Sequence, residues 1–420
     1  MSVEEEITQV NFASGQPPEN LLPFKLVSDA TSKLLIEYVA HGNCTGTVSP
    51  LSYGDNFSFF SQRLAKFLET ECGREYVDPD LLVPTAGVSN ALDLISTMLC
   101  KNLPRSKVVV VFVEDATYYL SMGIFEDHDL HIHAVPMDEY GIVIHEFRQL
   151  LQDMSREDSP YLPLFLYTIP TFHNPTGRTM PVQRRLELLH LTREYNVTVV
   201  ADEVYQMLGF TDILRGEPPQ AHNYARDCYP SLVSLACPAD DDNVTTAASV
   251  GGGGSCSFDH VISVSSFSKL LAPGLRVGWA EFSSPTLAQR FRSLGVLRSG
   301  SSICHFASCV AVSCMLLRGD GEQRAAEDTL TDTERRGYGH EASGSPAEEH
   351  YLPCPLRTHI RHVRGTLADK YGALTSALMR YSNEYLRSAD GRSDHEVGLD
   401  LWCTKQPAVT FVMQPIHHYR

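Results

Sequence analysis

The sequence lacks every feature that would direct the chain across or into a membrane. Residues 1–10 contain no basic segment followed by an apolar one, so no secretory signal is expected. No apolar run approaches the ~18–20 residues that a membrane-spanning helix needs. The longest run, Ile303–Leu317, is interrupted by Ser, His and Cys and predicts a buried helix. We therefore expect a soluble protein with a cytoplasmic location.

Basic charge and paired cysteines are also scarce. The chain has 34 Lys and Arg side chains against 51 Asp and Glu, which gives a formal net charge of −17. This excess argues against nucleic acid or an anionic membrane as a partner, because like charges repel. The 11 cysteines include no C-x-x-C pair, which favours reduced thiols. The histidine pairs His131/His133 and His417/His418 are interpreted as ordinary surface or core residues, so no metal site is expected.

Short apolar runs alternate with amphipathic stretches through the middle of the chain. Four runs predict buried parallel strands: Val108–Val113, Leu164–Thr168, Val197–Ala201 and Val261–Val264. Amphipathic segments such as Val182–Tyr195 predict helices between them. This alternation indicates an α/β fold with a mostly parallel sheet. Ligands of such sheets bind beyond the carboxyl ends of the strands, so functional residues are expected to follow the strands.

A lysine with hydroxyls beside it follows the last predicted strand. Ser266, Ser268 and Lys269 come directly after this strand, and Arg276 lies seven positions beyond the lysine. A lysine amine can condense with an aldehyde as a Schiff base, while hydroxyls and a guanidinium can hold a phosphate. The cluster therefore suits a phosphorylated aldehyde, although a serine-rich surface loop would contain the same residues.

Two other predicted strands are followed by polar residues. Asn174 opens an Asn-Pro-Thr-Gly segment, and its amide can hydrogen-bond a ring oxygen, or the segment can be a plain turn. Asp202 ends the strand Val197–Ala201, where a buried carboxylate needs a partner such as a protonated ring nitrogen. A helix N-cap is the alternative for this residue. Tyr205 follows one turn later and can reach the same ring oxygen as Asn174.

In chain order, the three segments read HNPTG, DEVY and SFSK-LAPGLRVGW. They resemble the class I/II aminotransferases, which are fold-type I enzymes that use pyridoxal 5'-phosphate (PLP). The resemblance is strongest to the group of kynurenine, 2-aminoadipate and aromatic multi-substrate aminotransferases. It implies reversible transfer of an amino group between an L-amino acid and a 2-oxo acid. It runs from about residue 11 to 317 and resumes at Leu356–Leu378.

The resemblance implies roles around the cofactor ring. Lys269 would hold PLP as a Schiff base and move the substrate proton, and Asp202 would face the ring nitrogen. Asn174 and Tyr205 would contact the 3-oxygen. Tyr118, in FVEDATYYL, would stack on the ring, although alanine replaces the usual proline two positions before it.

The resemblance also implies a phosphate site and a homodimer. The implied phosphate ligands are Ser266, Ser268, Arg276, the amides of Val88 and Ser89, and Tyr53 of the partner subunit. A glycine turn opens a helix before Val88, so the amides of that first turn would face an anion at the positive helix end. Gly15, in the N-terminal arm, would lie near the substrate.

The resemblance implies three parts: an N-terminal arm (1–39), a PLP domain (40–290) and a small domain (291–420), with polar insertions at 236–257 and 318–351.

The last residues, QPAVTFVMQPIHHYR, lack the family's Gly-Gly-aromatic strand and its late arginine for the substrate carboxylate. The codons of Pro407–Phe411, taken one base earlier, permit Gly-Gly-Tyr-Phe. We therefore interpret the segment after about Leu401 as a shifted reading of the gene that leaves the small domain incomplete. Sequencing of the transcript tests this: an in-frame stop after Arg420 with normal transamination would contradict it.

Two alternatives to transamination remain. The first keeps PLP and changes the reaction to β-elimination or decarboxylation, because fold does not decide reaction. The second is a PLP-binding protein whose activity is impaired by loss of the carboxylate clamp, or a ligand-sensing domain. Sensor relatives carry an N-terminal DNA-binding module, and the match to the family begins too early here to leave room for one.

Overall fold

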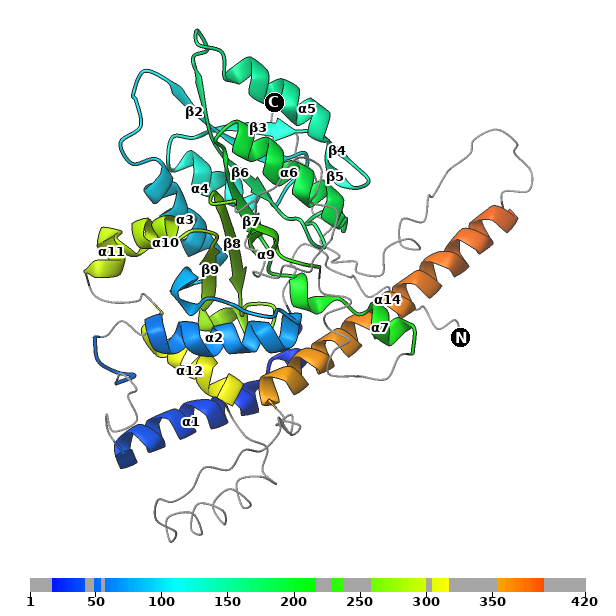
Figure 1. Cartoon of the computed structure of the whole chain (residues 1–420). Helices are drawn as coiled ribbons and strands as arrows, with labels where there is room; N and C mark the ends of the chain where they lie inside the picture. The colour runs from blue at the N-terminus through cyan, green and yellow to red at the C-terminus, as the bar shows by residue number, and fades with distance from the viewer. Residues whose placement is uncertain are drawn as a thin grey trace, which may run out of the picture.

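The computed structural model describes residues 17–41, 49–53, 57–216, 229–236, 258–299, 304–316 and 354–388. These residues form a sheet covered by helices on both faces, with a long helix extending from its lower end (Figure 1). Gly15, both polar insertions except Ala236, and the segment after Leu401 lie outside the described residues.

Seven strands form the main sheet in the order β1-β9-β8-β7-β6-β2-β3. Their bounds are β1 (Leu82–Thr85), β2 (Val108–Glu114), β3 (His131–Val135), β6 (Tyr161–Thr168), β7 (Thr198–Asp202), β8 (Val261–Ser266) and β9 (Gly278–Phe282). Strands β3, β2, β6, β7 and β8 pair in parallel, and β9 is antiparallel to both β8 and β1. A separate hairpin joins β4 (Met137–Asp138) and β5 (Gly141–Ile142). The mostly parallel α/β sheet predicted from the sequence is confirmed, and all four predicted strands lie on observed ones.

Helices cover the sheet and extend beyond one end of it. The described α-helices are α1 (Phe24–His41), α2 (Phe57–Cys72), α3 (Val88–Leu99), α4 (Leu120–Glu126), α5 (Ile144–Met154), α6 (Val182–Glu194), α7 (Thr211–Leu214), α9 (Leu232–Ala236), α10 (Pro285–Arg292), α11 (Gly295–Arg298), α12 (His305–Leu316) and α14 (Pro355–Ser388). The helices predicted at Val182–Tyr195 and Ile303–Leu317 are confirmed as α6 and α12. Helix α1 packs on α12, which also contacts α2 and α14 (Figure 1).

The sheet is buried on both faces, as expected for parallel strands. Side chains alternate across each strand. Along β2, Val111 and Val113 enter the larger apolar cluster, while Val110 and Phe112 enter a second cluster on the opposite face. The apolar runs of the sequence therefore fill two cores, one on each face of the sheet.

The strand ends place polar residues at one edge of the sheet. Thr168 pairs with Ala201, and Asp202 pairs with Val264, so β6, β7 and β8 end at nearly the same level. Glu114 ends β2 at this edge as well. Residues that follow different strands in the sequence therefore meet in space, which sets the position of the site described below.

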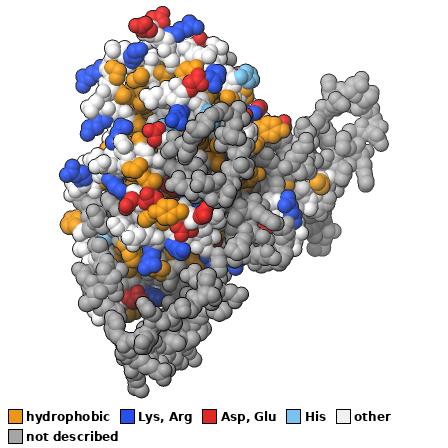
Figure 2. All heavy atoms as spheres, in the orientation of Figure 1, with side chains coloured by type: hydrophobic (Ala, Val, Ile, Leu, Met, Phe, Trp, Pro, Cys, Tyr) orange, Lys and Arg blue, Asp and Glu red, His pale blue; other side chains and the backbone are white. Residues whose placement is uncertain are grey.

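The outer surface mixes both signs of charge. On the face drawn in Figure 2, acidic and basic side chains of the described residues are interspersed, and apolar side chains lie among them. Several large apolar side chains are well exposed, notably Ile36 (66%) and Val39 (86%) on α1 and Leu51 (76%).

The close approach of β8, β9 and the loop before α3 predicts that Gly278 accepts no larger residue. A Cβ atom at Gly278 would lie 2.5 Å from Ser265 O and 3.0 Å from Gly87 Cα, and both neighbours are backbone. Gly278→Ala should lower the free energy of unfolding by about 1–3 kcal/mol, the usual cost of overpacking. Chemical denaturation measures this. Gly274→Ala is the matched control, because a Cβ there meets nothing within 4 Å, and a change within ~0.5 kcal/mol is expected. Equal stability of the two variants would contradict the packing argument.

Candidate active site

Lys269 and Asp202 come together at the carboxyl edge of the sheet. Lys269 lies in the turn after β8 and Asp202 ends β7. Burial lowers the pKa of the Lys269 ammonium, and the carboxylate of Asp202 acts in the opposite direction. A lysine with a lowered pKa carries more of the neutral, nucleophilic amine near neutral pH. Lys269 is half-buried beside a carboxylate. It is therefore not a plain surface lysine in a serine-rich loop, which was the alternative drawn from the sequence.

Asp202 is a buried carboxylate with only one oxygen held by a side chain. The residue is 5% exposed, and Tyr167 Oη donates a hydrogen bond to its Oδ2 at 2.9 Å. Its Oδ1 is buried and has no hydrogen-bond partner among the described residues. Burial raises the pKa of Asp202 to about 6, against the opposing effects of Tyr167, the Val204 amide and Lys269. A buried acceptor without a donor is costly, so this oxygen is suited to an N–H group of a ligand.

Asp202 is not a helix N-cap. The short 3-10 helix that follows, Gln206–Leu208, has Tyr205 at its N-cap position. The N-cap alternative considered from the sequence is therefore wrong, and the carboxylate is directed toward the site residues instead.

Tyr205 and Asn174 form a hydrogen-bonding pair next to this carboxylate. Both are buried, at 8% and 6% exposure. Burial and the charge of Asp202 raise the pKa of the Tyr205 phenol, and a side-chain hydrogen bond with Asn174 partly opposes this. Asn174 also belongs to a turn, as one of the two interpretations of its segment expected, and its role toward a ring oxygen stays a prediction. Tyr118 is half-buried nearby: burial first, and then the charge of Asp202, raise the pKa of its phenol.

A second part of the site has the features of an anion-binding position. Gly87 has φ of +92° and precedes α3, whose first residues are Val88 and Ser89. The first turn of a helix leaves its N–H groups without intrahelical partners and carries partial positive charge. A Cβ atom at Gly87 would lie 2.8 Å from Arg276 Nη2, and this guanidinium also donates to Ala86 O at 3.2 Å. The arginine therefore lies directly against the start of α3.

Two serine hydroxyls belong to the same anion-binding position. Ser266 Oγ lies 2.8 Å from Ser268 Oγ. Ser266 is paired across the sheet with Gly278, and Gly278 lies directly against Gly87, since a Cβ atom added to it would be 3.0 Å from Gly87 Cα. The predicted phosphate residues Ser266, Ser268, Arg276, Val88 and Ser89 are thus brought together around one point of the fold.

Two predicted site residues lie apart from this cluster or outside the described residues. Tyr53 is 92% exposed, so its side chain makes little contact within its own subunit. Gly15 falls outside the described residues. Their roles stay predictions.

Sequence reasoning missed the polar residues inside and behind the strands. Tyr167 was treated as part of an apolar run, although it is the one phenol near the end of that run. Glu114 ends β2 as Asp202 ends β7, and it received no role. Its carboxylate accepts hydrogen bonds from Thr168 Oγ1 (2.7 Å) and Ile169 N (2.8 Å), and its Oε2 lies 3.0 Å from His173 Nε2. This cluster holds the loop that carries Asn174. A polar residue at the end of an apolar strand was the available signal.

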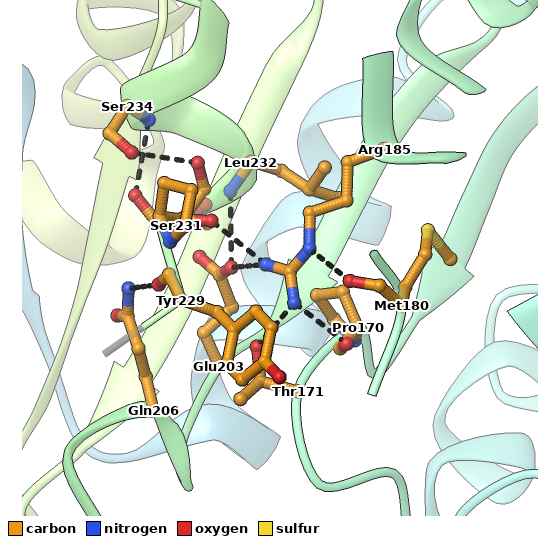
Figure 3. Close-up of polar contacts among 12 residues, drawn as sticks. Pro170, Thr171, Met180, Arg185, Glu203, Gln206, Tyr229, Ser231, Leu232 and Ser234 are labelled. Carbon is orange, nitrogen blue, oxygen red and sulfur yellow. Dashed lines mark hydrogen bonds and ion pairs between the residues drawn. The ribbon is translucent and has the colours of Figure 1, made fainter. Parts of the chain in front are cut away.

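A buried arginine, Arg185, also binds this loop, at Pro170 and Thr171 (Figure 3). Arg185 on α6 is fully buried, and its Nη2 donates to Pro170 O (2.9 Å) and Thr171 Oγ1 (2.8 Å). Its Nε donates to Met180 O and its Nη1 to Pro230 O, both at 2.8 Å. The guanidinium therefore joins the loop after β6 to the segment before α9.

Glu203 completes this network next to Asp202. Its Oε1 lies 3.8 Å from Arg185 Nη1 and accepts a hydrogen bond from Leu232 N at 3.1 Å. The Tyr229 ring lies 5.5 Å from the guanidinium carbon of Arg185 (Figure 3). Because Glu203 directly follows Asp202 in the chain, the hydrogen bonds of Glu203 also restrain the backbone of Asp202.

Neither a metal site nor a membrane-spanning helix is found among the described residues. No group of three or more His, Cys, Asp and Glu side chains there could hold a metal ion. No helix in that part of the chain is long and apolar enough to cross a membrane.

Removal of the buried guanidinium should destabilise the protein strongly. Arg185→Met leaves Glu203 without its counter-charge and several carbonyl groups without donors. We expect a loss of about 3–5 kcal/mol in the free energy of unfolding. Arg148→Met is the control, because Arg148 pairs with Glu194 between α5 and α6 with 40% of its side chain exposed, where a loss of about 0–1 kcal/mol is typical. Similar losses in the two variants, measured by denaturant titration, would show that Arg185 does not support the fold.

Comparison with known proteins identifies the family. The sequence profile of the aminotransferases of class I and II matches residues 7–314. YER152C, an uncharacterized protein of Saccharomyces cerevisiae, is 25% identical over 430 aligned residues, which cover 93% of this chain and 89% of that protein. Aromatic-amino-acid aminotransferase 1 of Thermococcus litoralis is 27% identical over 274 residues, covering 64% of this chain and only 53% of that protein.

A solved structure shows the same fold. The kynurenine aminotransferase of Pyrococcus horikoshii, determined in complex with PMP, superposes with a TM-score of 0.56 and 22% identity, covering 88% of this chain and 70% of that one. The seven-stranded sheet is thus the one found in fold-type I aminotransferase structures. With the profile match over most of its length, the chain belongs to the class I and II aminotransferase family.

Proposed function

We propose that this protein is a PLP-dependent aminotransferase that moves an amino group between an L-amino acid and a 2-oxo acid. The observation that carries the proposal is the juxtaposition of Lys269, whose pKa burial lowers, with the buried Asp202, whose Oδ1 has no partner among the described residues. One group can attach a carbonyl carbon covalently and the other can hold a ring N–H. Family membership supports the proposal independently of this geometry.

The described residues fit PLP at both ends of that molecule. Asp202 Oδ1 suits the pyridine nitrogen, and the Asn174–Tyr205 pair suits the 3-oxygen. The Tyr118 ring, which lies near Asp202, would stack on the pyridine. At the other end, the start of α3, Arg276 and the two serine hydroxyls supply N–H, cationic and O–H donors for a phosphate dianion.

PLP, when bound, supplies an electron sink for the electrons released at the substrate Cα. Asp202 keeps the proton on the ring nitrogen, which maintains that sink. Lys269 would hold the cofactor through Nζ and, once the substrate is bound, would act as the acid and base that moves the proton at the substrate Cα. Asn174 and Tyr205 donate to the 3-oxygen and keep the ring in one orientation. Arg276 and the hydroxyls keep the phosphate fixed while Lys269 is free to move.

We further propose a homodimer with shared sites, a cytoplasmic location and the domain boundaries given by the resemblance. Tyr53 is 92% exposed in one subunit, so a role in phosphate binding requires that it act on the partner's site. The exposed apolar residues Ile36, Val39 and Leu51 supply surface that a second subunit would cover. Helix α1 packs with α12 and, through it, with α14, which supports a small domain made from both ends of the chain.

β-Elimination and decarboxylation would use the same residues, so the site alone does not separate them from transamination. The distinction lies in where the amino group goes. Incubation of the holoenzyme with an amino acid alone should convert the cofactor to its pyridoxamine form in a transaminase, whereas a lyase or a decarboxylase would leave it as the aldehyde. A panel of amino donors against 2-oxoglutarate and pyruvate then identifies the substrates.

The role of Lys269 has a direct chemical test. The purified protein should be yellow, and borohydride should fix the cofactor covalently on the peptide that contains Lys269. Lys269→Ala should abolish this fixation, because it removes the amine proposed to attach the carbonyl carbon. Lys66→Ala, with a 75% exposed side chain on α2, is the control and should retain full fixation. Mass spectrometry of the digested protein locates the modified residue. Fixation that persists in Lys269→Ala would mean that the lysine is wrongly assigned.

A further inference from the structure

We propose that Tyr167 is a positioning residue that sets the orientation and charge of Asp202. Its phenol binds one carboxylate oxygen, so that the other faces the place where the ring nitrogen of the cofactor lies. The inference rests on the proposed PLP function. It concerns a residue of β6, whereas Asp202, on which it acts, ends the neighbouring strand β7.

The phenol of Tyr167 is held rigidly in the core. Tyr167 lies on β6 across from Val200 of β7 and is fully buried. Its ring packs edge-on against the Phe125 ring, with centroids 5.5 Å apart. Its hydroxyl donates to Asp202 Oδ2 at 2.9 Å. A ring that cannot move, with its oxygen at hydrogen-bonding distance, fixes the carboxylate plane to which it is bonded.

The direction of this hydrogen bond is also fixed. Burial, and then the nearby charge of Asp202, raise the pKa of the Tyr167 phenol well above its usual value. The phenol therefore keeps its proton at any working pH and donates it to the carboxylate. Asp202 Oδ2 is occupied as an acceptor, and Oδ1 is left for a donor from outside the protein.

The same bond opposes protonation of the carboxylate. Burial raises the pKa of Asp202 to about 6, and the hydrogen bond from Tyr167 is the largest effect in the opposite direction, ahead of the Val204 amide and Lys269. Glu114, at the end of β2, adds to the upward shift. Loss of the phenol should therefore raise the pKa of Asp202 further. A larger share of the carboxyl would then be neutral near pH 7 and unable to retain a proton on a ring nitrogen.

A purely structural role for Tyr167 predicts something different. A phenylalanine at this position would fill the same volume and make the same ring contact with Phe125, so a residue that only packs would be replaced at little cost to the site. A positioning residue loses its function when the hydroxyl alone is removed. Tyr167→Phe separates these two cases, because it keeps the ring and removes only the hydroxyl, with its hydrogen bonds to Asp202 and Ser121.

Tyr167→Phe should weaken PLP binding by about 10- to 100-fold, the range expected for loss of a hydrogen bond to a charged group. Binding is measured by titration of the apoprotein with PLP. The acidic limb of the binding curve against pH should move to higher pH, because the pKa of Asp202 rises without its donor. Turnover should fall, with the KM for the amino acid little changed. Tyr161→Phe, at the other end of β6 against the His131 ring, is the matched control and should leave binding and its pH profile unchanged.

A double-mutant cycle with Asp202→Asn tests whether Tyr167 acts through the carboxylate. Asp202→Asn alone should lower turnover by well over ~10²-fold, since a neutral amide cannot hold the ring proton. In that background Tyr167→Phe should weaken PLP binding less than threefold, because the charge that it serves is gone. The cycle is also measured on the free energy of unfolding of the apoproteins, a readout that needs no cofactor. Coupling between the two substitutions supports the inference there as well, and additive effects overturn it.

The outcome separates this inference from the proposed function. If the unmodified protein binds no PLP, the proposed function fails and the inference fails with it. If it binds PLP, and Tyr167→Phe matches it in affinity and pH profile, the proposed function stands and only the role of Tyr167 is wrong.

Discussion

The buried carboxylate of Asp202 is the group on which the arrangement of the site depends. A charge in the core must be held by hydrogen bonds or opposite charge, because water is excluded there. Tyr167 and Lys269 provide this only in part, and the pKa of Asp202 stays raised, at about 6. One oxygen remains without a donor among the described residues. Within the described part of the chain this carboxylate is therefore left with an incomplete set of partners, and an N–H group of a ligand would satisfy it.

The parallel sheet makes this incomplete position possible. Strands β2, β6, β7 and β8 end at one edge, so their last side chains and the loops that follow them face one another. Two buried charge clusters fix these loops. The Glu114 carboxylate holds the segment around Thr168 and His173, and the Arg185 guanidinium holds Pro170 and Thr171. The segment that leads to Asn174 is thus restrained by two buried clusters, which suits a site that must align a ring oxygen.

Helix α14 connects this edge with the rest of the chain. Arg364 donates to Asp212 Oδ1 at 2.7 Å and also to the carbonyl of Gly209, just beyond the turn that carries Tyr205. Arg357, one turn from the start of the helix, pairs with Glu71 on α2. Burial raises the pKa of Glu71 even against this arginine. These pairs hold α14 against α2 and against the segment that follows Tyr205.

The sequence by itself determined the fold class, the main strands and the family motifs. This is possible because apolar runs, turn residues and a reactive lysine beside hydroxyls are local patterns. Lys269, Asp202, Asn174 and Arg276 could be chosen in this way, since each follows an apolar strand or a glycine turn. Glu114 ends β2 as Asp202 ends β7 and could have been chosen by the same rule. Tyr167 and Arg185 could not, because each lies inside a strand or helix whose local pattern is satisfied by packing alone. The tertiary structure decided their roles. A buried polar side chain must find its partner on another element, and which element it meets depends on the order of strands in the sheet rather than on its neighbours in the chain.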